Sequence, residues 1–197
     1  MNYLISKNKN GNDLCELFLS NPVAAAVKND EGLNKSLESD SPVIFVLYGD
    51  IIRIPEIVSR IKSSGKIAMV HIDLVDGLSQ REIAADFIAR KTDADGILST
   101  KQQIIRHAKS LGLLTIQRFF LLDSMTLENI EKQLPQECAD MIEILPGPMP
   151  KVVKKITAFS SKPVIVGGLI SDKEDIINSL KAGAVAVSTT NPELWFV

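Results

Sequence analysis

The feature that most constrains this chain is an alternation between short apolar runs and longer segments of helical periodicity. Several of the runs are apolar at nearly every position, as in VIFVLY and PVIVGG. This pattern is typical of strands in a parallel sheet, because helices cover both faces of such a sheet. The predicted strands are residues 23–27, 43–48, 67–72, 96–99, 113–119, 141–145, 163–166 and 184–188.

Helices are predicted between these strands, and several of their ends carry recognisable signals. Ser79 and Glu82 have the spacing of a capping box at the start of one helix. Gly112 and Gly183 directly follow two of the helices, where a residue in the left-handed conformation is common. The predicted helices are residues 31–39, 55–63, 79–91, 101–111, 126–134, 150–159 and 172–182.

Repeated strand–helix units predict a parallel sheet with right-handed crossovers. Eight strands favour a closed barrel over a doubly wound open sheet, and no G-x-G-x-x-G follows the first strand. We therefore expect an α/β protein with one compact (β/α)8 TIM-type barrel domain over residues 1–197, joined by short loops. Residues 12–20, within the N-terminal segment 1–20, are predicted to form a further helix that closes the bottom of the barrel.

Composition narrows the class of protein. The formal charge of −2 gives no overall attraction to a polyanion. The two cysteines, Cys15 and Cys138, fit neither a metal cluster nor a disulfide framework. The first residues contain no apolar run typical of a signal peptide, and no stretch is long enough to span a membrane. We expect a cytoplasmic protein with no metal and no cofactor.

In a (β/α)8 barrel, residues at the carboxyl ends of the strands converge on one mouth. Polar residues are frequent at these positions of the sequence. A solvated loop would explain any one of them, but together they predict a ligand-binding site. The candidate ligand-binding residues are Lys28, Asp50, His71, Asp73, Lys101, Arg118, Glu143, Gly167, Gly168, Ser188 and Thr189.

The loops after the seventh and eighth strands predict a phosphate site. Gly167 and Gly168 would let the backbone approach an anion closely, although a pair of glycines more often marks only a tight turn. Ser188, Thr189 and Thr190 supply N–H and hydroxyl donors, and the following helix would add partial positive charge at its N-terminus.

Two further groups leave alternatives open. His71 and Asp73 are two residues apart in the third strand and would share one face. They fit an acid/base pair or two ligand contacts, and His71 also fits a buried core histidine. Lys28 and Lys101 could each be a Schiff-base lysine, but a charge partner for Glu143, Asp50 or the phosphate is the simpler interpretation.

The remaining histidine, His107, is expected to lie on the surface of its helix. No second histidine stands at a metal-ligand spacing from it or from His71. A zinc site is therefore not predicted.

The chain resembles a known family in long contiguous blocks that span nearly everything beyond the first twenty residues. The family is the glycerol-3-phosphate-responsive antiterminators, also called glycerol uptake operon antiterminator regulatory proteins. The blocks are VIFVLYGDI (43–51), MVHIDLVDGLS (69–79), ADGILSTK (94–101), LLTIQRFFLLDS (113–124), MIEILPGPMPK (141–151), VGGLISDKED (166–175) and AVSTTNPELW (186–195).

This resemblance implies a regulator and not an enzyme. Such a protein senses glycerol 3-phosphate and promotes read-through of a leader terminator in glycerol-utilisation transcripts by acting on the leader mRNA. Strand position then suggests two groups of contacts. Gly167, Gly168, Ser188 and Thr189 would hold the phosphate, whereas Lys28, His71, Asp73, Arg118 and Glu143 would reach the phosphate or the glycerol hydroxyls.

Two other functions remain open. One is an enzyme acting on a small phosphorylated three-carbon substrate, with His71, Asp73 or Glu143 as acid or base, because a fold does not dictate a function. The other is a glycerol-phosphate buffering or interaction protein with no nucleic-acid role.

An RNA-binding surface is harder to predict, because no RNP-type or KH-type signature occurs. The basic candidates are Arg53, Arg60, Lys62 and Lys66 around helix 55–63, and Lys151, Lys154 and Lys155 on helix 150–159. Such charge also fits an ordinary solvated surface. A homo-oligomer would merge weak basic patches into one surface, so we expect self-association.

Overall fold

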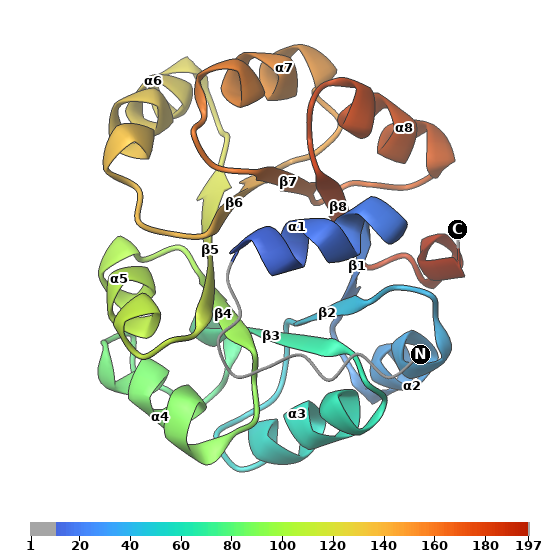
Figure 1. Ribbon diagram of the computed structural model, residues 1–197, viewed down its shortest axis with the longest axis vertical. Helices are drawn as coiled ribbons and strands as arrows, with labels where there is room; N and C mark the ends of the chain where they lie inside the picture. Colours follow the sequence, from blue (N-terminus) through green and yellow to red (C-terminus); the bar gives the residue numbers. More distant parts are fainter. Residues whose placement is uncertain (1–10, 197) are drawn as a thin grey trace.

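The computed structural model describes residues 11–196, which form a closed barrel of eight parallel strands (Figure 1). Each strand pairs with the next along the chain, and β8 pairs with β1 to close the sheet. The predicted (β/α)8 barrel is confirmed. The strands are β1 (Val23–Val27), β2 (Val43–Val46), β3 (Ile67–His71), β4 (Gly96–Ser99), β5 (Leu114–Phe120), β6 (Met141–Leu145), β7 (Val164–Gly167) and β8 (Ala186–Thr189).

The helices that join the strands form a ring around the barrel (Figure 1). Their bounds agree with the predicted ranges to within a few residues. The α-helices of the ring are α2 (Asp30–Glu38), α3 (Ile54–Ser63), α4 (Ile83–Lys91), α5 (Gln102–Ser110), α6 (Ser124–Gln133), α7 (Pro150–Phe159) and α8 (Lys173–Lys181). Short 3-10 helices are η1 (Ile72–Leu74), η2 (Leu134–Gln136) and η3 (Pro192–Phe196).

One predicted helix start is wrong. Helix α4 begins at Ile83, and Glu82 occupies its N-cap position without a side-chain hydrogen bond. The preceding segment is held elsewhere, because Asp76 exchanges backbone hydrogen bonds with Gly49 and Ile51 of the β2–α3 loop. The chain is therefore not free to begin a helix at Ser79.

The predicted left-handed residues are confirmed. Gly112 has a φ of +80° and Gly183 a φ of +101°, so each ends its helix in a conformation that strains residues with a Cβ. Three helices begin at side-chain N-caps that were not among the predicted helix signals. At these positions the side chains of Asn29, Asp123 and Asp172 accept a backbone N–H from the first turn.

The interior of the barrel is filled by alternate residues of the strands, among them Phe45, Met69 and Ile116. Helix α1 (Gly11–Ser20) lies across one end of the barrel (Figure 1), and its Leu14 and Phe18 belong to the same interior cluster. The helix expected at residues 12–20 therefore closes the bottom, while residues 1–10 lie outside the described part of the chain.

The other faces of the strands pack against the helices in a second and larger cluster of buried apolar side chains. The strands are buried on both faces, which explains their continuous apolar sequences. With the bottom filled by α1, the mouth at the carboxyl ends of the strands is where polar groups enter the barrel. Over residues 11–196, no helix is long and apolar enough to cross a membrane.

Candidate ligand site at the barrel mouth

A cavity of about 490 Å³ opens at the carboxyl ends of the strands. This volume is in the range of small-molecule sites in proteins. The loops after β7 and β8, which the sequence singled out for phosphate binding, lie side by side in its wall. The lining residues are Ala26, Leu47, Arg118, Leu145, residues 168–171 and residues 188–191.

The loop after β7 has an unusual backbone. Gly168 has a φ of +70°, and Leu169, with a φ of +59°, is the one non-glycine residue with positive φ in the described chain. Leu169 is also 77% exposed, so packing does not explain its conformation. In the described part of the chain, the backbone N–H groups of Leu169, Ile170 and Thr190 have no hydrogen-bond acceptor. Free N–H groups in a cavity wall are donors for an anion.

Gly167 is required for a different reason. A Cβ at this position would overlap Ser188 Oγ and would lie 2.8 Å from Glu143 Oε1. The absence of a side chain therefore leaves room for a buried hydrogen bond between Ser188 and Glu143, and Gly168 provides the turn that follows.

A buried chain of polar groups joins β5, β6 and β8 beneath the cavity. Arg118 Nε donates to Glu143 Oε2 at 2.6 Å, and Ser188 Oγ donates to Glu143 Oε1 at 2.5 Å. The Glu143 side chain is fully buried, and that of Arg118 is 7% exposed. A buried carboxylate is stable only when it is paired and hydrogen-bonded, and both conditions are met here.

Arg118 is the cation of the cavity. It stands beside Glu143 in the β5–β6 register, and its side chain lines the cavity wall. Of its guanidinium N–H groups, only Nε–H has a hydrogen-bond partner in the described part of the chain. The ion pair therefore fixes the guanidinium in place, while its Nη groups remain available to a ligand.

His71 ends β3 and is 3% exposed. Its Nδ1 atom is buried and has no hydrogen-bond partner in the described part of the chain. Burial, helped by the nearby positive charge of Arg118 and opposed by Asp73, lowers the pKa of His71 to about 4. The imidazole is therefore neutral at physiological pH.

Asp73 does not share a strand face with His71, and this expectation is wrong. Strand β3 ends at His71, and Asp73 lies in the 3-10 helix η1. Its carboxylate accepts hydrogen bonds from Ser99 Oγ at 2.7 Å and from Thr100 N and Oγ1 at 2.7 and 2.9 Å. These bonds hold the start of the β4–α5 loop, so Asp73 stabilises the rim of the mouth.

Asp50 likewise supports a loop. Its carboxylate accepts the backbone N–H groups of Ile52 and Arg53 at 2.8 and 2.9 Å, just before α3. The fixed turn carries the chain from β2 into the helix, and the side chain is not among those that line the cavity.

The two strand-end lysines are not partners of Glu143 or Asp50, so of the partners named by the simpler interpretation only the phosphate stays a prediction. Arg118 occupies the place beside Glu143. Lys28 lines a smaller hollow of about 160 Å³, which shares Ala26 and Thr190 with the main cavity. Lys101 occupies the N-cap position of α5 and faces a separate hollow on that helix.

Three members of the site were not predicted from the sequence. Ala26 and Leu47 form an apolar part of the wall, and Ser171 extends it after Ile170. Ala26 and Leu47 resemble ordinary strand residues, so no local signal could have found them. Ser171 lies three residues after Gly168, so position was the available signal.

Most basic candidates for RNA contact around α3 are engaged within the chain. Arg53 forms an ion pair with Asp30 at 2.7 Å, and Lys62 forms one with Asp95 at 2.7 Å. Lys66 donates to the carbonyl of Ser41 at 2.9 Å.

Arg60 donates to Asn34, which leaves the α3 group without a free cation. On α7, Lys155 stands 3.8 Å from Glu131, whereas the ammonium groups of the exposed Lys151 and Lys154 have no partner in the described part of the chain.

His107 is partly exposed, as expected for a surface helix, and its Nε2 lies 2.8 Å from Asp86 Oδ2 of α4. Over the described residues, no three His, Cys, Asp or Glu side chains gather in an arrangement that could hold a metal ion.

Together the fold and the site define a class: a (β/α)8 barrel whose mouth combines a fixed arginine with free backbone donors. Comparison with known proteins gives the family. The chain belongs to the family of glycerol-3-phosphate responsive antiterminators, whose model matches residues 23–195.

Individual relatives agree with this assignment. The chain is 45% identical over 182 residues to the uncharacterized protein YgcP of Escherichia coli strain K12, covering 92% of this chain and 95% of YgcP. It is similar to the crystal structure of a glycerol uptake operon antiterminator regulatory protein from Listeria monocytogenes, with a TM-score of 0.85 and 34% identity over 89% of this chain and 95% of that one. A related protein from Thermotoga maritima gives a TM-score of 0.78 and 32% identity, over 88% and 96% of the two chains.

Proposed function

We propose that this protein binds glycerol 3-phosphate in the mouth cavity and, in response, acts on the leader mRNA of glycerol-utilisation genes. One observation carries the proposal. The guanidinium of Arg118 and the free backbone N–H groups of Leu169, Ile170 and Thr190 lie in the wall of the same cavity. Arginine and clustered backbone N–H groups are both common binding groups for phosphate in proteins.

The ion pair below the cavity supports this function. Glu143 holds Arg118 in one orientation, so little side-chain freedom remains to be lost when an anion binds. Of the three candidate acid/base groups, His71 and Asp73 do not line the cavity, and Glu143 is paired with Arg118 and Ser188 beneath it. We therefore infer a sensor and not an enzyme.

The remaining parts of the proposal follow from this role. An antiterminator works where transcripts are made, so we propose that the protein acts in the cytoplasm. Its effect on RNA requires a ligand-dependent equilibrium between two states, because a ligand shifts an equilibrium only by its differential affinity. We further propose that the working form is a homo-oligomer.

Thr190 offers a clean test of the ligand site, because it is exposed, lines the cavity and has no side-chain partner in the described part of the chain. Isothermal titration calorimetry should detect glycerol 3-phosphate binding to the unchanged protein and to Thr190→Asn, the matched neutral control. Thr190→Asp should bind at least about tenfold more weakly, because a carboxylate would stand within a few ångströms of the phosphate.

Equal affinities for the Asp and Asn variants would refute the placement of the phosphate. Phosphorus NMR of the same mixtures should show bound ligand and no new product. Turnover of glycerol 3-phosphate would instead favour the enzyme.

A further inference from the structure

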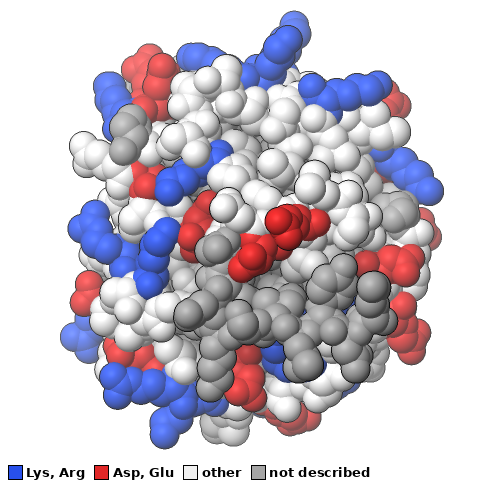
Figure 2. Space-filling model, in the orientation of Figure 1, with Lys and Arg blue, Asp and Glu red and all other residues white. Residues whose placement is uncertain are grey.

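Helices α4 and α5 carry exposed cations that are not used inside the protein. Arg81 precedes α4, Lys91 ends it, and Arg106 lies on α5; all three are exposed. Together with the partly exposed Lys101, they have no ion pair or hydrogen bond from their charged groups over residues 11–196. Figure 2 shows basic side chains at the left and lower left, over α5 and α4, with acidic side chains interspersed.

Two shallow hollows lie on the same helices. The first, of about 390 Å³, is lined by Lys101, Gln102, Gln103 and Arg106 at the start of α5. The second, of about 340 Å³, is lined on α4 by Ile83, Asp86, Phe87, Arg90 and Lys91. The two helices contact each other, and the hydrogen bond of 2.8 Å between His107 and Asp86 crosses from one to the other.

This combination of groups fits one kind of partner. A single-stranded RNA needs cations for its phosphates, a flat or apolar side chain for its bases and amides for the base edges. Here arginine and lysine side chains adjoin Phe87, the 61% exposed Ile83 and the side-chain amides of Gln102 and Gln103. We propose that the exposed faces of α4 and α5, termed the α4–α5 face, form the docking surface for single-stranded leader RNA. This inference rests on the proposed function.

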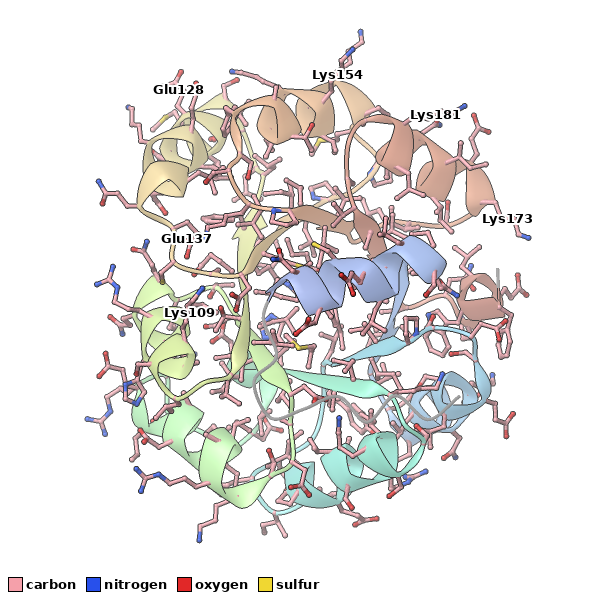
Figure 3. All side chains as sticks on the ribbon, in the orientation of Figure 1. Lys109, Glu128, Glu137, Lys154, Lys173 and Lys181 are labelled. Carbon is pink, nitrogen blue, oxygen red and sulfur yellow. The ribbon has the colours of Figure 1, made fainter. Side chains whose placement is uncertain are left out.

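The other basic surface is less complete. Lys151 and Lys154 of α7 are exposed, and Lys154 points away from the barrel (Figure 3). Helix α7, however, has the sequence PKVVKKITAF and contains no amide side chain. It offers charge to a phosphate backbone but nothing to read a base edge.

The α4–α5 face is also connected to the ligand cavity. Gln117, the neighbour of Arg118 in β5, donates through Nε2 to the carbonyl of Thr100 at 2.9 Å. Thr100 immediately precedes Lys101, which occupies the N-cap position of α5. This hydrogen bond joins the strand that carries Arg118 to the residue before α5, so the ligand cavity and the α4–α5 face share a direct structural link.

The test compares two double variants that remove the same charge from different faces. Lys91→Gln with Arg106→Gln alters the α4–α5 face, and Lys151→Gln with Lys154→Gln is the matched control on α7. The probe is a fluorescently labelled leader transcript of the glycerol-utilisation genes. Its binding is followed by anisotropy across a salt series, with and without glycerol 3-phosphate. Thermal unfolding and calorimetry check that each variant is folded and still binds the ligand.

In the α4–α5 variant, we expect the plot of log affinity against log salt concentration to become less steep by roughly 1.4. Two phosphate contacts are removed, and each contact with a single strand contributes about 0.7 to the slope. Near 0.1 M salt this corresponds to roughly twenty-five-fold weaker binding. The α7 variant should keep the affinity of the unchanged protein. Equal losses in both variants, or a loss confined to α7, would overturn the proposed face. If the unchanged protein bound no leader RNA in either ligand state, the RNA-directed function would fail first, and the proposed face would fail with it.

Discussion

The buried histidine of the mouth gives the sharpest prediction about stability. His71 is 3% exposed and stands near the positive charge of Arg118, and its pKa falls from 6.5 to about 4. Below pH 6.5 the unfolded chain therefore binds a proton at this residue that the folded chain does not bind. Stability contributed by neutral His71 is fully present above pH 6.5 and is lost as the pH falls toward 4.

The size of the effect follows from the shift. One pKa unit corresponds to about 1.4 kcal/mol, so the full window from 6.5 to about 4 is worth about 3 kcal/mol. Acidification from about pH 7.5 to about pH 5 covers most of this pH range. Linkage then predicts that the free energy of unfolding falls by about 2 kcal/mol. Removing the titrating group should remove this part of the pH dependence.

The assay is urea unfolding of the unchanged protein and of His71→Asn at the two pH values. All other titrating groups are common to both proteins, so their contributions cancel in the difference. On acidification, the free energy of unfolding of the unchanged protein should fall by about 2 kcal/mol more than that of the variant. If both proteins lost the same amount, His71 would not be held neutral by burial, and the reasoning would be refuted.

Two further predictions concern the ion pair beneath the mouth and the helix that closes the opposite end of the barrel. Glu143→Gln should lower the free energy of unfolding by about 3 kcal/mol at neutral pH, because it leaves the buried Arg118 without its counter-charge; an unchanged urea midpoint would contradict the importance of the ion pair. Phe18→Ala should cost about 3–5 kcal/mol, because this side chain fills the bottom of the barrel. Leu19→Ala, on the same helix but 86% exposed, should change the stability by no more than about 0.5 kcal/mol. Equal effects of these two substitutions in thermal or urea unfolding would show that α1 does not close the barrel.

Much of the fold could be predicted from the sequence because its signals are local. The apolar runs follow from burial on both faces of each strand, and the glycines after α5 and α8 follow from their left-handed conformation. Even the closing helix was predictable, since Leu14 and Phe18 stand four residues apart on one face. The loops around Gly168 and Thr189 were predicted to line one site from the strand count alone.

The tertiary structure decided which polar side chains form hydrogen bonds and ion pairs with one another. Glu143 is joined to Arg118 across 25 residues of sequence and to Ser188 across 45. Asp73 binds Ser99, 26 residues away at the end of β4, instead of lining the ligand cavity.

Such pairings depend on strand register, and on where each strand ends, which no local pattern records. The sequence by itself determined the barrel and the position of its mouth. The structure alone determined that an arginine, fixed by a buried carboxylate, supplies the charge there, because burial forces every ionised group to find a partner from a neighbouring strand.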